Sequence, residues 1–238
     1  MRKLVSKTYI ILALSLLNAC NQEVKDEVKV AHLNTNYGDI EFVLLDETPL
    51  HKANFIAQVE DSLYSKMLFH RVIENFVIQA GNPLSKGLAE DAPLYDDGDG
   101  PIVKKEILPQ FHHIRGAVGA AREGDNVNPE RNSSYSHFYI VHGLNNDILT
   151  DSMINHDGMT PPRFAEEFRK NGGTPHLDGA YTIFGYVVEG MNTVDSIAKV
   201  ATGSGDRPIK NVVINRVDIK NVKRSKIEDL QIYKFFNE

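Results

Sequence analysis

The sequence predicts a mainly β protein: a closed eight-stranded antiparallel β-barrel capped by two helices. About eight apolar runs of strand length are separated by turn residues, and only two principal stretches of the same region have helical periodicity. The chain has 238 residues, of which 42% are hydrophobic, so it can build one sizeable core. Short strands around one core, with helices at the ends, are typical of a closed barrel.

The first predicted strands are residues 28–37 and 39–46, and residues 37–39 predict the turn of a hairpin between them. Thr48 then predicts a helix N-cap, because Pro49 after it suits the first helical position. The apolar residues expected on one face of this helix are Leu50, Ala53, Phe55, Ile56 and Val59. We expect the helix to cover one end of the barrel.

Residues 69–83 (FHRVIENFVIQAGNP) predict the next two strands and hold the main functional candidates. Two short apolar runs place one arginine, Arg71, one aromatic residue, Phe76, and one amide, Gln79, close together before a Gly-Asn-Pro turn. Arginine is always charged and presents a planar fork of N–H donors, so Arg71 is a candidate hydrogen-bond donor to a ligand. Without further pattern, an arginine on the surface or at a barrel end is the plainer interpretation.

The remaining strands are predicted from three later segments, residues 116–122, 132–141 and 175–191. A second helix is predicted at about residues 191–199 and a last strand at residues 211–220. The helix positions expected to face inward are Val194, Ile197 and Ala198.

Residues 144–173 predict a helical insertion beside the site. Residues 160–161 (Thr-Pro) predict a helix start, and Phe164 and Phe168 are spaced to share one helical face. Residues 172–173 (Gly-Gly) predict the end of this helix. The role of the insertion does not follow from its sequence.

Residues 1–19 predict an export signal peptide. Three basic residues precede an apolar stretch at residues 8–17, which is too short to span a bilayer. Residues 17–20 (LNAC) resemble the bacterial lipobox, in which cleavage leaves a diacylated cysteine, here Cys20, at the new N-terminus. An ordinary secretory leader and a buried cysteine are the open alternatives. Cys20 is the only cysteine of the chain, so no intramolecular disulfide can form.

This signal predicts an exported, membrane-anchored lipoprotein that faces the periplasm, and it leaves open whether the inner or the outer membrane holds the anchor. Residues 20–29 are polar and charged, which suits a lipidated tether. The folded domain is predicted at residues 30–220 and a C-terminal tail at residues 221–238, with a candidate amphipathic helix at residues 225–238.

Composition argues against several classes of function. The formal net charge is -6, and a mildly acidic surface is unsuited to binding nucleic acid. The nine histidines show no His-x-x-x-His spacing and no cysteine partner, so we predict no metal and no cofactor. The acidic run at residues 96–101 lacks the spacing of an EF-hand calcium loop. No Ser-His-Asp arrangement is recognisable, so hydrolase chemistry has no support.

Three blocks of the sequence, in order, resemble the motifs of the cyclophilin-type peptidyl-prolyl isomerases. Residues 69–83 are similar to Phe-His-Arg-Val/Ile-Ile-x-x-Phe-Met-x-Gln-Gly-Gly-Asp, and residues 116–122 and 132–141 resemble the next family segments. Residues 175–191 resemble His-Leu-Asp-Gly-x-Tyr-Thr-Val-Phe-Gly-x-Val-x-x-Gly-Met. The resemblance covers residues 30–220. It implies a cyclophilin-like barrel that catalyses cis/trans rotation about X-Pro bonds without a cofactor or a covalent intermediate.

The resemblance also implies a site. Arg71, Phe76 and Gln79 match the catalytic positions, where the arginine donates toward the proline nitrogen and the amide orients the arginine. The substrate-binding positions that the resemblance implies are Val77, Ala121, Arg122, His137, Phe138, Tyr139, His176, Leu177 and Tyr181. We expect Phe76 and Phe138 to share one apolar hollow near the guanidinium, and the backbone of residues 119–122 to bind an extended peptide.

Among the residues that depart from the family pattern, Val77 replaces a methionine, Ala80 one of two glycines and His137 a glutamine. A proline-peptide binding module or holdase chaperone with little turnover therefore stays open beside the enzyme. The predicted partners are proline-containing polypeptides and, through the lipid anchor, the membrane. We expect a monomer.

Overall fold

The structure, a computed structural model, describes residues 26–95, 100–144, 147–155, 158 and 160–227. The predicted signal peptide, Cys20 and residues 228–238 of the predicted tail lie outside the described residues. Eight strands close into an antiparallel barrel in the order β1-β10-β3-β4-β8-β6-β9-β2. The predicted fold class is confirmed.

The barrel strands are β1 (Glu27–Thr35), β2 (Gly38–Leu44), β3 (Met67–Val72), β4 (Val77–Ala80), β6 (Ala117–Ala120), β8 (Phe138–Val141), β9 (Ile183–Glu189) and β10 (Val213–Lys223). A separate small sheet pairs β5 (Ile102–Val103) with β7 (Ser133–Ser134). The helices are α1 (Pro49–Glu60), α2 (Asp151–Ile154), α3 (Pro162–Asn171) and α4 (Met191–Ala198). Short 3-10 turns are η1 (Pro83–Ser85), η2 (Pro175–Leu177), η3 (Ser204–Asp206) and η4 (Arg224–Lys226).

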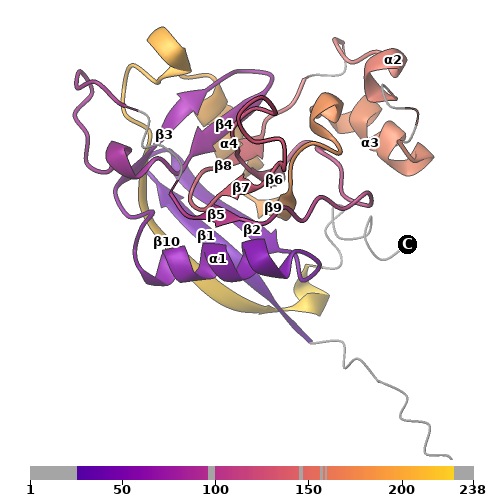
Figure 1. Ribbon diagram of the computed structural model, residues 1–238, viewed down its shortest axis with the longest axis horizontal. Helices are drawn as coiled ribbons and strands as arrows, with labels where there is room; N and C mark the ends of the chain where they lie inside the picture. The colour runs from indigo at the N-terminus through magenta and orange to yellow at the C-terminus, as the bar shows by residue number, and fades with distance from the viewer. Residues whose placement is uncertain (1–25, 96–99, 145–146, 156–157, 159, 228–238) are drawn as a thin grey trace, which may run out of the picture.

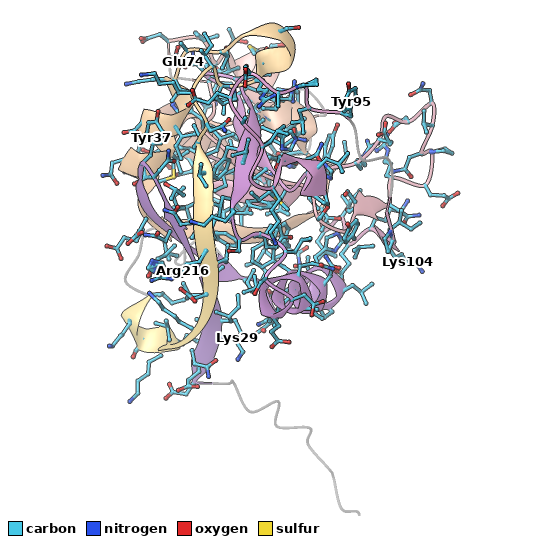
Figure 2. The ribbon with its side chains drawn as sticks, turned by 90° about the vertical axis from the view of Figure 1, so that its left-hand side faces the viewer. Lys29, Tyr37, Glu74, Tyr95, Lys104 and Arg216 are labelled. Atoms are coloured by element: carbon cyan, nitrogen blue, oxygen red, sulfur yellow. The ribbon has the colours of Figure 1, made fainter. Side chains whose placement is uncertain are left out.

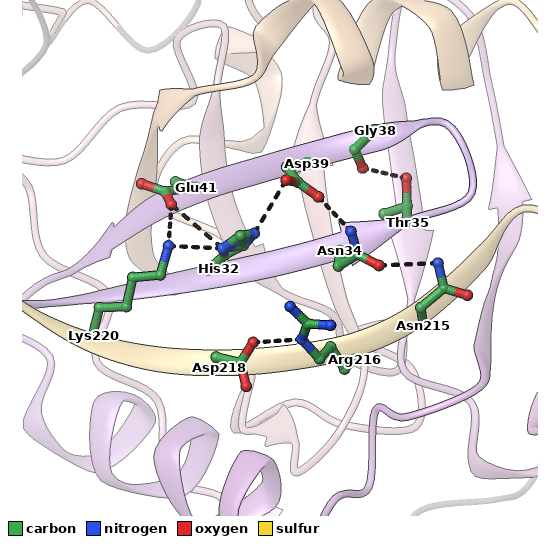
Figure 3. Close-up of polar contacts among 10 residues, drawn as sticks. All are labelled: His32, Asn34, Thr35, Gly38, Asp39, Glu41, Asn215, Arg216, Asp218 and Lys220. Carbon is green, nitrogen blue, oxygen red and sulfur yellow. Dashed lines mark hydrogen bonds and ion pairs between the residues drawn. The ribbon is translucent and has the colours of Figure 1, made fainter.

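The first two strands form the predicted hairpin, and Oγ1 of Thr35 donates to the carbonyl of Gly38 at 2.6 Å in its turn. Polar side chains link the outer faces of β1, β2 and β10 (Figure 3). Nζ of Lys220 donates to Oε1 of Glu41 at 2.6 Å and to Nδ1 of His32 at 2.8 Å. Exposed pairs of this kind contribute little to stability, so the hairpin depends mainly on its buried inner face.

The helix α1 begins where the sequence predicts, with Thr48 at the N-cap position and Pro49 after it. Thr48 makes no side-chain capping hydrogen bond. The carboxylate of Glu106, from a distant loop, instead accepts the backbone N–H groups of Leu50 and His51 at 3.0 Å each. It also accepts Nδ1–H of His51 at 2.7 Å, and Nε2 of His51 lies 2.9 Å from Oγ of Ser133. A residue far away in the sequence therefore caps this helix.

The same polar contacts set which face of α1 is buried. His51 and Phe55 are its buried residues, whereas Leu50 is 49% exposed and Ala53 is exposed as well. The predicted apolar face is therefore wrong for Leu50 and Ala53. The hydrogen bonds of His51 to Glu106 and Ser133 turn the His51 side of the helix inward instead. The other predicted residues of this face pack against the barrel core.

Aromatic side chains fill the barrel interior. The ring of Phe138 contacts those of Phe42, Phe55, Tyr64 and Phe69, with centroids between 5.5 and 6.5 Å apart. All five side chains are buried. Aromatic pairs at these separations add to the stability gained from burial alone.

The chain leaves β4 through a glycine. Gly81 has φ +108°, and a Cβ at this position would overlap the backbone carbonyl of Ser136. Ala80 is not among the described non-glycine residues with positive φ, and it lies buried in the barrel core. Its departure from the family pattern therefore causes no backbone strain.

The segment at residues 144–173 contains α2 and α3, which lie together at one side of the barrel (Figure 1). Phe164 and Phe168 are buried on the same face of α3, and the helix ends at Gly172 with φ +85°, as predicted. The helix α4 buries the three residues predicted to face inward. None of the helices in the described residues has the length and apolar character that a membrane span requires.

Candidate functional site

The strand register places a row of predicted site residues on one outer face of the barrel. Arg71 of β3 pairs with Gln79 of β4, Gln79 pairs with Tyr139 of β8, and Tyr139 pairs with Gly119 of β6. Residues directly opposite each other in antiparallel strands project from the same face, and their chain neighbours project from the other. The row therefore faces outward while the adjacent residues of β4, β6 and β8 fill the interior. In β3 the register shifts between Phe69 and Arg71, so His70 also lies on the outer side.

The guanidinium of Arg71 has polar partners on two sides. Its Nη1 donates to Oε1 of Gln79 at 3.4 Å, and its Nε lies 3.4 Å from Oδ2 of Asp206 in η3. Both distances are long for charge-assisted hydrogen bonds, and the side chain of Arg71 is 38% exposed. Exposed contacts of this length contribute little to stability, so the arginine can exchange them for a ligand at small cost.

A cavity of about 700 Å³ opens beside this row. The predicted site residues that line it are Arg71, Gln79, Ala121, Arg122 and His137. Wall residues that the sequence analysis missed include Glu90, Asp91, Tyr95, Glu123 and Arg207. The volume is within the range of ordinary ligand pockets. Within the described residues, no group of three potential metal ligands is close enough to hold an ion.

The predicted apolar residues pack into one cluster that joins the cavity. Its members from the predicted set are Phe76, Val77, Tyr139, Leu177 and Tyr181. The rings of Tyr139 and Tyr181 meet nearly edge to face, at 5.9 Å and 86°. The exposed ring of His176 stacks on Phe76 at 5.6 Å and 18°. Ala121 belongs to the cavity wall and also packs on this cluster, so the two surfaces are continuous.

Phe138 is a correction to the predicted site. Its side chain is 1% exposed and lies inside the barrel among the core aromatics. Phe76 belongs to the outer cluster instead, so the two residues do not share a hollow as expected. The reason is the alternation of β8: Tyr139 faces outward, and its neighbour Phe138 must face inward. Of the two adjacent residues predicted to bind substrate, only Tyr139 belongs to the outer cluster.

The strand expected to bind an extended peptide is already paired in part. The backbone N–H of Ala121 donates to the carbonyl of His137 at 3.0 Å, and its carbonyl accepts the N–H of Ser134 at 2.9 Å. The guanidinium of Arg122 is nearly buried and lies 4.6 Å above the ring of Tyr181. The backbone N–H of Ala121 is therefore unavailable to a peptide. Arg122 is part of the cavity wall and packs on Tyr181.

The turn that carries Phe76 is held by a residue that the sequence analysis did not assign to the site. Nδ1 of His142 accepts the backbone N–H of Asn75 at 2.9 Å, and the N–H groups of His142 and Gly143 donate to the carbonyl of Phe76 at 3.0 Å each. Burial lowers the pKa of His142, and the nearby Arg115 lowers it further. This shift favours the neutral imidazole, which can accept the Asn75 bond.

A second unpredicted group lies behind Tyr139. Its hydroxyl is 2.8 Å from Nε2 of His113, whose Nδ1 is 2.7 Å from Oδ1 of Asp178. Oδ2 of Asp178 lies 2.7 Å from Nδ1 of His112. Burial alone would raise the pKa of Asp178, but the hydrogen bonds from both histidines outweigh it and lower the pKa to about 2. The only sequence signal for this group was the place of Asp178 within the third motif.

Residues 30–219 match the family model described as cyclophilin type peptidyl-prolyl cis-trans isomerase/CLD. The chain is 34% identical over 205 residues to a Staphylococcus haemolyticus protein named as a peptidyl-prolyl cis-trans isomerase, which covers 84% of this chain and 96% of the relative. A Staphylococcus aureus protein of the same name is 31% identical over 204 residues, with the same coverage. A crystal structure of a Cryptosporidium parvum cyclophilin type peptidyl-prolyl cis-trans isomerase has a TM-score of 0.59 at 24% identity. It covers 81% of this chain and 98% of that one, so the fold is shared.

Proposed function

Because the chain belongs to the family of cyclophilin-type peptidyl-prolyl cis-trans isomerases, we propose that it assists the folding of exported proteins. It is an isomerase of X-Pro peptide bonds. Uncatalysed isomerisation of these bonds takes tens to hundreds of seconds, which is slow enough to limit folding. Proline-containing segments of newly exported chains are the proposed substrates.

Arg71 is the proposed catalytic donor. Rotation must break amide resonance, a barrier of about 18 to 20 kcal/mol. In the twisted state the proline nitrogen regains its lone pair, so an N–H donor aimed at it stabilises the transition state more than the ground state. The observation that carries this role is the alignment of Arg71 with Gln79, at 3.4 Å, on a cavity wall whose Ala121 packs on the cluster around Phe76.

The apolar cluster is the proposed seat of the proline ring. Phe76, Val77, Leu177 and Tyr139 supply apolar surface, and the shorter Val77 leaves more room than the family's methionine. A charged hydrogen bond contributes about 1.5 to 3 kcal/mol, and about 1.4 kcal/mol corresponds to tenfold in rate. Arg71 therefore supplies part of the acceleration, and binding geometry supplies the rest.

An isomerisation assay on an X-Pro peptide tests this assignment. We expect Arg71→Ala to lower kcat/KM roughly 10- to 100-fold, and Arg71→Lys to give an intermediate value because it keeps the charge but loses the planar fork. The control is Arg216→Ala on β10, which lies on the other side of the molecule from the cavity residue Tyr95 (Figure 2). Equal rates for Arg71→Ala and wild type would assign the site to binding alone, as in a holdase.

We further propose that a lipid on Cys20 anchors a monomeric protein to the membrane on its periplasmic side. Lys29, near the start of β1, and Glu74, in the turn before Phe76, lie at opposite ends of the molecule (Figure 2). A tether that precedes β1 would thus join the molecule at the end opposite this turn.

Mass spectrometry of the mature N-terminus tests the anchor, with Cys20→Ala as the matched control. We expect wild-type protein in the membrane fraction with a diacylated first residue, and the variant in the soluble exported fraction. A mature chain that starts at another residue contradicts the anchor without touching the isomerase assignment. Light scattering of the purified protein checks the monomer.

A further inference from the structure

The phenol of Tyr139 is a polar group that the outer apolar cluster buries beside the proposed proline seat. Its ring lies over Gly119, where a Cβ would overlap it, and meets the ring of Tyr181 edge to face. Tyr139 is 4% exposed, and burial raises the pKa of its hydroxyl well above the usual range. The hydroxyl therefore stays protonated, and the direction of its O–H bond depends on the group that accepts its hydrogen bond.

That partner is fixed by a chain of contacts. Oδ1 of Asp178 accepts the backbone N–H of His113 at 2.7 Å and lies 2.7 Å from Nδ1 of the same residue. An ionised carboxylate only accepts hydrogen bonds, so Nδ1 of His113 must carry a proton. In the neutral imidazole Nε2 is then an acceptor, and the hydroxyl 2.8 Å away donates to it.

We propose that His113, oriented by Asp178, is a positioning residue that holds the Tyr139 hydroxyl away from the proline seat. The ring of Tyr139 then presents carbon to the cluster around Phe76, while its oxygen is satisfied behind the wall. Asp178 directly follows η2, which carries Leu177, and its carboxylate also contacts His113 behind Tyr139. One carboxylate therefore links the segment that carries Leu177 to the tyrosine on the other side of the apolar seat. This inference rests on the proposed placement of the proline site.

A double-mutant cycle on kcat/KM tests the coupling. We expect His113→Leu to lower kcat/KM about tenfold, equal to about 1.4 kcal/mol, because the hydroxyl loses its buried acceptor and turns toward the seat. In a Tyr139→Phe background the same substitution should change kcat/KM less than about twofold. His113→Gln, whose side-chain carbonyl can accept the hydroxyl, should restore most of the wild-type value.

The matched control is His112→Leu. The side chain of His112 makes the equivalent hydrogen bond to Asp178 and is also buried, but it packs on Phe164 of α3 rather than on Tyr139. Loss of this bond should lower stability while kcat/KM per folded molecule stays within about twofold of wild type. A purely structural network would give His112→Leu and His113→Leu the same effect on kcat/KM, and it would make the His113 and Tyr139 changes additive.

Nitrogen-15 NMR of the full wild-type protein gives an independent readout that needs no variant. We expect His113 as the Nδ1–H tautomer at neutral pH, and an Nε2–H tautomer or additive kinetics overturns the proposal. The Arg71→Ala assay is unaffected by that result, so failure of the positioning role and failure of the isomerase site can be told apart.

Discussion

Across β3 and β4, Nη1 of Arg71 lies 3.4 Å from Oε1 of Gln79, its directly paired neighbour. The amide thus lies within reach of the guanidinium from the same outer face. We expect Gln79→Ala to lower kcat/KM roughly tenfold, because Arg71 loses the group that orients it toward the substrate. Peptide isomerisation kinetics with a thermal melt of the same sample measure the effect.

Gln58→Ala on α1 is the control for that change. Gln58 contacts Asn54 within its own helix and lies outside the cavity wall. Its kcat/KM should equal that of wild type. A Gln79→Ala enzyme with unchanged kcat/KM would show that Arg71 is oriented without the amide, for example by its ion pair with Asp206.

The two phenylalanines that the sequence analysis placed together should respond in opposite ways to substitution. Phe138→Leu should lower the free energy of unfolding by roughly 1 to 3 kcal/mol and leave kcat/KM per folded molecule close to wild type. Phe76→Leu should lower kcat/KM and cost less stability, because its side chain is only half-buried and lies at the site. Urea unfolding and peptide kinetics on both variants separate the two roles.

Replacing the carboxylate that caps α1 should destabilise the fold. Glu106→Gln keeps the shape but loses the charge that faces the helix N-terminus, so we expect a loss of about 1 kcal/mol in the free energy of unfolding. Urea unfolding at neutral pH measures it. Glu166→Gln on the exposed face of α3 is the matched control and should change the value by less than about 0.5 kcal/mol.

The free energy of unfolding should fall as pH is lowered below about 6.5. Burial lowers the pKa values of His51 and His142 in the folded protein from the 6.5 of an unfolded chain. The unfolded state therefore takes up protons first, and stability is lost from pH 6.5 down to the folded pKa values. Asp178 adds a second loss between pH 3.8 and about 2, where the unfolded carboxyl is protonated and the folded one is not.

Urea titrations at pH 7.5, 6.0 and 5.0 check the first window. His142→Asn supplies a control, because an asparagine carbonyl can accept the Asn75 N–H and does not titrate. This variant should show a smaller drop between pH 7.5 and 5.0 than wild type. A drop of the same size in both proteins would remove His142 as a source of the pH dependence.

Local patterns determined much of the architecture in advance. The hairpin, the two strands at residues 69–83, the start of α1 and the inner face of α4 depend on alternation, turn residues and helical spacing, which act over a few neighbouring positions. The predicted N-cap position, Thr48, is correct, but the groups that accept the first N–H groups of α1 belong to Glu106, a residue brought in from elsewhere in the chain. No short-range pattern contains that contact.

By itself, the sequence determined the barrel, the family and which residues compete for the site, since motif order and periodicity are properties of the linear chain. Only the tertiary structure decided that Tyr139 and not Phe138 faces the site, that the backbone N–H of Ala121 is already paired, and that His113 and Asp178 lie behind the tyrosine. The physical reason is that face and hydrogen-bond partner are set by register between strands and by loops distant in sequence, and both exist only once the barrel has closed.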